Sequence, residues 1–218
     1  MAVRNQHDDI IDMWKTASSP NYRYFSKVER EQDTLVFWAP ATPFRRLFET
    51  LDLTRTLEIA CGHGRHAARV PDRYESLTLL DTSIDAIRHA AHRFADNPKI
   101  HTVLSADGIT LPLADDSLTA VYCYDAMVHF EPMTVFGYLK EIHRVLAPGG
   151  RALLHHSAYG ENPEGPFTSS PHWRNYMPPS LFRHFCSRAA LGIVEQVVMD
   201  WGDVPQCDAL SLIEKPLS

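Results

Sequence analysis

The sequence predicts an α/β fold, in which helices cover both faces of a doubly wound, mostly parallel sheet that ends in an antiparallel pair of edge strands. The first observation is an alternation, between residues 56 and 155, of short apolar strand-like segments with segments whose apolar residues recur at helical spacing. Such alternation is typical of parallel sheets, whose right-handed crossovers place helices on both faces. The second observation is a pair of apolar segments after residue 190, which are joined by a turn too short to hold a helix.

Length and composition favour one ordinary globular domain. The 218 residues suffice to bury a core without disulfides, and 44% hydrophobic with 22% charged residues exclude a disordered chain. The net charge of −6 comes with no Lys/Arg-rich run, which argues against a nucleic-acid partner. No apolar run reaches the roughly 20 residues that cross a bilayer, and the N-terminus lacks a signal-peptide core. The four cysteines form no CxxC pair, so we expect a reduced, cytoplasmic protein. We further expect a monomer or homodimer without a membrane partner.

Residues 1–50 are expected to form a helical cap or lid, ahead of the doubly wound domain over residues 51–218. His7–Ala17 can form one short helix, which a proline-containing stretch then ends. Apolar residues recur at helical spacing over Val28–Leu51, but two prolines interrupt them. We therefore expect two helices there rather than one.

From residue 56 onward the expected elements follow in a regular order. Strands are expected at Thr56–Ala60, Leu77–Leu80, Ile100–Leu104, Thr119–Tyr124 and Arg151–His155, and helices directly after the first strand and at Ile84–Phe94 and Thr134–Leu146. In the tail we expect a helix at Pro179–Ala190, and an antiparallel pair of strands at Gly192–Met199 and Ala209–Lys215, joined by a turn with Trp201, Gly202 and Pro205. The proline-rich stretch at residues 157–178 shows no regular pattern, and a loop of this length is usually functional or disordered.

The strongest single signal is Leu57–Ala67, LEIACGHGRHA, which reads as a strand, an acidic residue, small residues and a helix start. Small residues let the backbone turn sharply and approach a ligand closely. A dinucleotide fold would place a pyrophosphate at the start of that helix. Glu58, however, comes just before the turn, where a carboxylate repels phosphate and attracts an ammonium or sulfonium. The motif therefore favours a cationic amino-acid ligand, with a purely structural tight turn as the alternative.

Two further carboxylates follow strand ends. Asp81 comes about 20 residues after the glycine turn, where a carboxylate can accept hydrogen bonds from both hydroxyls of a ribose. Alternatively, Asp81 only caps the next helix, although Thr82 or Ser83 could do so instead. Asp107 follows the third strand, where an aspartate can accept a hydrogen bond from the exocyclic amine of adenine.

Together with Thr110–Phe130 (TLPLADDSLTAVYCYDAMVHF) and Glu141–His155 (EIHRVLAPGGRALLH), these segments resemble the successive motifs of class I S-adenosylmethionine-dependent methyltransferases. The resemblance covers roughly Leu57–His156. It implies a Rossmann-like domain with a seven-stranded sheet, whose last two strands form the antiparallel edge pair. It also implies the cofactor S-adenosylmethionine, which leaves as S-adenosylhomocysteine.

The resemblance further implies which residues contact the cofactor. The glycine turn would contact the methionine part, the second strand end the ribose, the third strand end the adenine, and Tyr124 or Asp125 the vicinity of the methyl group. The implied cofactor residues are Glu58, Ala60, Gly62, Gly64, Asp81, Thr82, Asp107, Gly108 and Tyr124. Ala60 departs from the family, which has its first glycine there. The additional methyl group is tolerated if φ at Ala60 is negative.

A hydroxyl acceptor must lose a proton during methylation, and histidine is the usual base. His129 is the first candidate, because it follows the fourth strand on the side where cofactor and acceptor would meet; the alternative is a histidine packed at a helix start. His155 is the second candidate, together with His156. Because side chains alternate along a strand, one of the two should point to the cleft and the other into packing. Asp125 could orient a histidine or touch the amino-acid group. A metal site that draws on Asp125, His129, His155 or His156 is an alternative, but nothing in the spacing demands one, so we expect none.

A small-molecule acceptor is expected to meet aromatic residues in the N-terminal segment and in the 157–178 loop, although at least half of these should only pack. They are Trp14, Tyr22, Tyr24, Phe25, Trp38, Tyr159, Phe167, His172, Trp173 and Tyr176. Our first hypothesis is methylation of a natural-product or saccharide hydroxyl. The alternatives are N-methylation of an amine or a protein side chain, a non-catalytic binding partner with this fold, and a nucleotide hydride enzyme, which the lack of a full GxGxxG disfavours.

Overall fold

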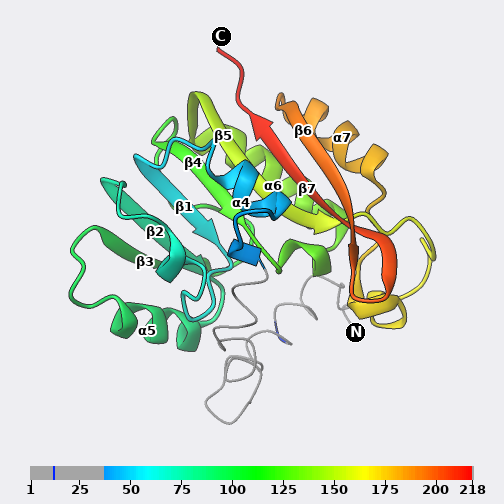
Figure 1. Cartoon of the computed structure of the whole chain (residues 1–218), viewed down its shortest axis with the longest axis horizontal. Coiled ribbons are helices and arrows are strands. Elements are labelled where there is room, and N and C mark those ends of the chain that lie inside the picture. The colour runs from blue at the N-terminus through cyan, green and yellow to red at the C-terminus, as the bar shows by residue number, and fades with distance from the viewer. Residues whose placement is uncertain (1–11, 13–36, 218) are drawn as a thin grey trace.

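The computed structural model in Figure 1 describes Asp12 and residues 37–217. Its centre is one seven-stranded sheet with the strand order β3-β2-β1-β4-β5-β7-β6. All pairings among the first five strands are parallel, whereas β7 pairs antiparallel with both β5 and β6. The predicted fold, a doubly wound sheet with an antiparallel edge pair, is therefore confirmed.

The strands and helices lie close to the ranges expected from the sequence. The strands are β1 (Arg55–Ile59), β2 (Ser76–Asp81), β3 (Ile100–Leu104), β4 (Leu118–Cys123), β5 (Leu146–Ser157), β6 (Gly192–Trp201) and β7 (Val204–Glu214). The helices are α4 (Pro43–Phe48), α5 (Ile84–Arg93), α6 (Pro132–Val145) and α7 (Pro179–Arg188). Short 3-10 turns are η1 (Ala67–Arg69), η2 (Met127–His129), η3 (Phe167–Ser169) and η4 (Pro171–Trp173).

Side chains of the sheet alternate between two cores, as the period of two along a strand requires. In β4, Val121 and Cys123 belong to a cluster that includes the buried faces of α6 and α7. Their neighbours Ala120 and Tyr122 belong to a second cluster with α4 and α5. The helices therefore cover both faces of the sheet, and burial on both sides explains why the central strand β4 is mostly apolar.

Two local expectations were wrong. The helix expected directly after β1 is replaced, in the described chain, by a turn and the three-residue η1. Val70 already has an extended ψ of 128°, because the residue before a proline, here Pro71, is pushed away from helical ψ. Pro205 lies inside β7 rather than in the hairpin turn.

Only Asp12 and residues 37–50 of the predicted N-terminal cap are described, so the expected helix at residues 7–17 lies outside the described residues, apart from Asp12. α4 begins at a proline after Thr42, whose side chain accepts a hydrogen bond from Arg45 N (3.2 Å). Trp38 and Phe44 are buried in the core. Trp38 is therefore one of the aromatic residues that only pack, and it does not face an acceptor. None of the described helices is long and apolar enough to cross a membrane.

The 157–178 segment lies beside the β6–β7 turn (Figure 1) and holds η3 and η4. The segment contacts this turn through His172, whose Nε2 lies 3.4 Å from the carboxylate of Asp203 in the turn. Phe167 is buried, whereas Trp173 is 46% exposed. The segment therefore contributes both packing and surface aromatic side chains at the end of the sheet.

Candidate functional site

The glycine turn follows β1 and approaches its neighbours closely. Gly62 and Gly64 have φ values of 54° and 76°, in the left-handed region that favours glycine. A Cβ atom on Gly64 would lie 2.5 Å from Phe94 Cε2, so no larger residue fits there without a shift. Cys61 N donates a hydrogen bond to Leu80 O (3.0 Å), which ties the turn to β2.

Ala60 differs from what we expected, since its φ is 56° rather than negative. The turn needs a left-handed residue at this point, where the sequence supplies a side chain. A non-glycine residue in this region is strained by about 1–2 kcal/mol.

Replacing Ala60 by glycine is therefore expected to raise the free energy of unfolding by up to about 1 kcal/mol. The relief of strain exceeds the roughly 0.4–1 kcal/mol lost through the greater freedom of glycine in the unfolded chain. Urea unfolding measures the difference. Ala86→Gly within α5 serves as the control and should lower stability by about 1 kcal/mol. A loss of stability in both variants would show that Ala60 is not strained.

Asp81, the last residue of β2, holds the turn from the side. Its Oδ2 accepts a hydrogen bond from Gly62 N and its Oδ1 accepts one from Ser83 N, both at 2.9 Å. Ser83 Oγ caps α5 by accepting from Ala86 N (3.3 Å), so Asp81 is not needed as the cap. Asp81 and the adjacent Thr82 are half-buried. Each carboxylate oxygen of Asp81 keeps a further lone pair, with which it can accept a hydrogen bond from a hydroxyl group.

Glu58 lies beneath the turn, and its side chain points into the core. The residue is 2% exposed, and its Oε2 accepts a hydrogen bond from Tyr122 Oη (2.7 Å). Burial raises the pKa of Glu58 to about 8, although the Tyr122 bond and the charge of Arg65 oppose the rise. A buried carboxyl group that holds a proton at neutral pH does not supply the exposed negative charge that we expected from the sequence. Its role in this arrangement is to support the turn.

The raised pKa of Glu58 predicts a pH dependence of stability. The unfolded chain releases this proton above about pH 4.5, whereas the folded chain keeps it up to about pH 8, so stability is lost as the pH rises between these values. Glu58→Gln cannot ionise, and its stability relative to the wild type should increase by about 1 kcal/mol or more between pH 5 and 8. Denaturant unfolding at several pH values measures this, with Glu164→Gln on the exposed loop as the control. A difference that does not change with pH would contradict it.

Asp107 organises the loop after β3. Its Oδ1 accepts from Ile109 N (3.0 Å) and Thr110 N (2.9 Å), and its Oδ2 accepts from Thr110 Oγ1 (2.6 Å). Partial burial opposes ionisation, but these hydrogen bonds lower the pKa of Asp107 to about 2. Gly108, with a φ of 66°, completes the turn. The result is an exposed, ionised acceptor at the end of β3.

An ion pair that we did not predict connects the glycine turn with the end of β4. Arg65 Nη2 lies 2.6 Å from Asp125 Oδ2, and both side chains are nearly buried, at 12% and 13% exposure. Asp125 has a left-handed φ of 57°. An arginine beside a carboxylate offers opposite charges to the carboxylate and ammonium groups of an amino acid. The arginine directly after the glycine turn in LEIACGHGRHA was the signal for this site.

Tyr124 belongs to an aromatic cluster at the same end of the sheet. It is 5% exposed, and its ring stacks on that of His155 with 4.5 Å between the centroids. Phe37 and Phe44 contact its other sides, at 4.6 Å and 4.3 Å between centroids. Tyr124 therefore forms part of an apolar wall behind Asp125.

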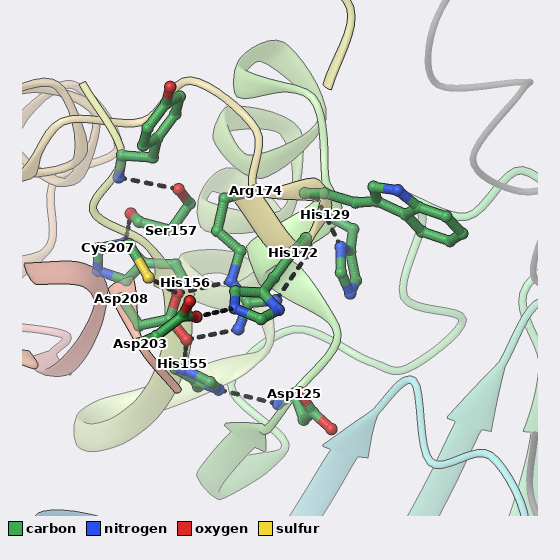
Figure 2. Close-up of polar contacts among 12 residues, drawn as sticks. Asp125, His129, His155, His156, Ser157, His172, Arg174, Asp203, Cys207 and Asp208 are labelled. Carbon is green, nitrogen blue, oxygen red and sulfur yellow. Dashed lines mark hydrogen bonds and ion pairs between the residues drawn. The ribbon is translucent and has the colours of Figure 1, made fainter. Parts of the chain in front are cut away.

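His129, in η2, is 8% exposed, and its Nδ1 lies 2.9 Å from Trp173 O (Figure 2). A carbonyl oxygen can only accept, so Nδ1 carries the proton and Nε2 carries the lone pair. Burial lowers the pKa of His129 from its usual value, although the Trp173 bond opposes the change. His129 is thus a neutral imidazole whose Nε2 is a base.

His155 is not placed as we expected. Its Nδ1 accepts from Asp125 N (3.1 Å), its Nε2 lies 2.9 Å from Asp208 Oδ2, and its side chain is completely buried. Both ring nitrogens are therefore engaged, and neither can take a proton from an acceptor in this arrangement. His156 points to the opposite face and stacks on Phe182 of α7, with 3.6 Å between centroids. Within the described part of the chain, no group of three or more His, Cys, Asp or Glu side chains could hold a metal ion.

A family model described as a methyltransferase domain matches residues 56–150. This range contains the glycine turn, the Arg65–Asp125 pair, Asp81 and Asp107. Residues 56–150 are thus similar to a methyltransferase domain.

Curated relatives match about half of the chain. The O-methyltransferase rstn1 of Aspergillus nomiae is 32% identical over 103 residues, which are 46% of this chain and 45% of the relative. A malonyl-[acyl-carrier protein] O-methyltransferase of Alcanivorax borkumensis is 31% identical over 112 residues, which are 50% of this chain and 37% of the relative. The matched part of the chain thus spans less than half the length of these relatives.

Among solved structures, the geranyl diphosphate C-methyltransferase of Streptomyces coelicolor, crystallised with Mg²⁺, geranyl diphosphate and S-adenosylhomocysteine, has a TM-score of 0.72. The alignment covers 98% of this chain and 99% of that protein at 14% identity. At this identity the likeness supports the fold of the methyltransferase domain, and substrate choice depends on residues that differ.

Proposed function

We propose that this chain transfers a methyl group from S-adenosylmethionine to a hydroxyl oxygen of a small molecule. One observation carries the proposal: the glycine turn contacts two groups that suit different parts of one ligand. The carboxylate of Asp81 suits a ribose, and the ion pair of Arg65 with Asp125 suits an amino acid. The two halves of S-adenosylmethionine have this chemistry, since the molecule combines a nucleoside with a zwitterionic amino acid.

The side chains present fit that cofactor. Asp81 would accept hydrogen bonds from the ribose hydroxyls, Asp107 one from the adenine amine, and Arg65 and Asp125 would hold the carboxylate and ammonium groups. Glycine at positions 62 and 64 adopts the left-handed φ that the turn needs without a Cβ atom, which lets the backbone approach a ligand closely. When bound, S-adenosylmethionine supplies a methyl group that is already activated by a positively charged sulfur. The contribution of the protein is then largely positioning.

An oxygen acceptor is supported by His129 and by the names of the relatives. His129 is neutral, and its Nε2 can receive the proton of a hydroxyl while Nδ1 stays bonded to Trp173 O. The cofactor would supply the methyl group to the acceptor oxygen, with its carbon–sulfur bond breaking, and His129 Nε2 would take up the hydroxyl proton. Relatives from two organisms are named O-methyltransferases. The 157–178 segment, which presents Trp173, would form one side of the acceptor site.

Calorimetric titration with S-adenosylhomocysteine, and separately with NAD, tests the cofactor. We expect binding of the first and not of the second. Transfer of labelled methyl groups to a panel of small hydroxyl compounds and matched amines then tests the acceptor. A folded protein that does not bind S-adenosylhomocysteine would overturn the proposal, and transfer to amines alone would overturn its oxygen part.

A further inference from the structure

A buried polar chain runs from the 157–178 segment to the end of β4 (Figure 2). Arg174 of that segment donates from Nε to Asp208 Oδ1 (2.7 Å) and from Nη2 to Asp208 Oδ2 (2.6 Å). Asp208 of β7 also lies 2.9 Å from His155 Nε2, and His155 Nδ1 lies 3.1 Å from Asp125 N. The side chains of Arg174, Asp208 and His155 are 3%, 0% and 0% exposed.

The partners of His155 determine its tautomer. A backbone N–H can only donate, so Nδ1 must carry a lone pair toward Asp125 N. Nε2 must then carry the proton and donate it to Asp208. Although burial opposes ionisation, the hydrogen bonds from Arg174 and His155 hold the pKa of Asp208 well below its usual range. Asp208 is therefore an ionised acceptor that selects the tautomer of His155 with which Asp125 N can pair.

Asp125 is a residue that needs such an anchor. Its φ of 57° is unfavourable for a residue with a side chain, and its carboxylate is the partner of Arg65. Released from His155, the backbone at Asp125 can relax toward negative φ, which would turn its carboxylate away from Arg65. The position of the ion pair in the cofactor site thus depends on a hydrogen bond to its backbone.

We propose that Asp208, His155 and Arg174 are positioning residues, which hold Asp125 for the amino-acid part of S-adenosylmethionine and couple that site to the 157–178 segment. This inference rests on the proposed function. Because Arg174 belongs to the segment and also holds Asp208, the order of the segment and the affinity for the cofactor rise and fall together. Coupling of this kind is reciprocal, so the bound ligand should in turn stabilise the segment.

Two substitutions of His155 separate this role from a general effect on packing. In His155→Asn, the side-chain oxygen takes the place of Nδ1 and can still accept from Asp125 N, whereas the contact with Asp208 is lost. In His155→Gln, the amide nitrogen takes the place of Nε2 and can still donate to Asp208, whereas Asp125 N loses its partner. Each variant loses one buried hydrogen bond, so a purely structural role predicts similar effects. His156→Gln is the matched control on the opposite face.

Calorimetry with S-adenosylhomocysteine is the readout, with thermal unfolding to show that each variant folds. Loss of the partner of a buried N–H should raise the Kd of His155→Gln about tenfold or more, while His155→Asn and His156→Gln stay within about threefold of the wild type. Equal Kd values for the two His155 variants would overturn the inference while the proposed function stands. A wild-type protein that does not bind would instead overturn the proposed function.

Limited chymotrypsin digestion adds an independent readout that keeps the inference testable if one variant does not fold. In the wild type, S-adenosylhomocysteine should slow cleavage after Trp173 and Tyr176, and Arg174→Met should reduce both this protection and the affinity. Protection that is the same in the wild type and in Arg174→Met would contradict the coupling.

Discussion

Asp81→Ala is expected to weaken S-adenosylhomocysteine binding by roughly 100-fold or more, which is the largest effect on affinity that we predict. Two hydrogen bonds from ribose hydroxyls to a charged acceptor would be lost, each worth about 1.5–3 kcal/mol. The substitution also removes the acceptor of Gly62 N, so the glycine turn loses one of its ties to β2, while the Cys61 N–Leu80 O bond remains. Both losses act on the same ligand.

Two controls separate binding from folding. The cap of α5 is the Ser83 hydroxyl, so this helix should persist in Asp81→Ala, as far-UV circular dichroism can verify. Asp85→Ala removes a carboxylate from the first turn of the same helix and should leave the Kd unchanged within about twofold. An Asp81→Ala protein that binds S-adenosylhomocysteine as the wild type does would remove Asp81 from the cofactor site.

His129→Ala is expected to lower kcat for a hydroxyl acceptor by about 10²–10⁴-fold, the range that general acid–base catalysis contributes. The affinity for S-adenosylhomocysteine should stay nearly unchanged, since the proposed role of His129 is toward the acceptor. His129→Asn is the informative companion, because its amide nitrogen can still donate to Trp173 O while no base remains at the place of Nε2. Equal losses in both variants would point to the missing base, whereas full activity of His129→Asn would leave only a structural role.

The pH dependence gives a second test of His129. Burial lowers the pKa of His129, so the neutral, basic form persists to pH values below the usual histidine pKa of 6.5. The rate of hydroxyl methylation should therefore stay level at neutral pH and fall only as the pH drops below about 6.5. Methylation of an amine that binds in its neutral form needs no such base and should survive in His129→Ala.

The strands and most helices could be predicted because their signals are local. β3 has the range that we expected, and α5 ends one residue earlier than expected. Apolar residues specify both elements locally, and a capping serine in addition specifies the start of α5. The helix after β1 was mispredicted because a motif suggested it. Gly62 and Gly64 instead have left-handed φ, and Pro71 keeps Val70 extended, so only the three-residue η1 forms between them.

The candidate site divides in the same way. The glycine turn and Asp81 could be found by their spacing, because both follow strand ends close in sequence. The sequence alone could not place Glu58, since the same strand residue would face a ligand or the core depending on what packs beneath it. Tyr122, 64 residues away in the sequence, donates a hydrogen bond to the Glu58 carboxyl group inside the core, and this contact decides where the side chain points.

The sequence by itself determined the doubly wound sheet, the edge pair of antiparallel strands and the residues at the strand ends, because hydrophobic period and turn chemistry act over a few residues. Only the tertiary structure decided which charges meet. Arg65 and Asp125 are 60 residues apart, and His155 and Asp208 are 53 apart, so their pairing depends on strand order and register. The strain at Ala60 and Asp125 likewise arises from backbone geometry that neighbouring elements impose.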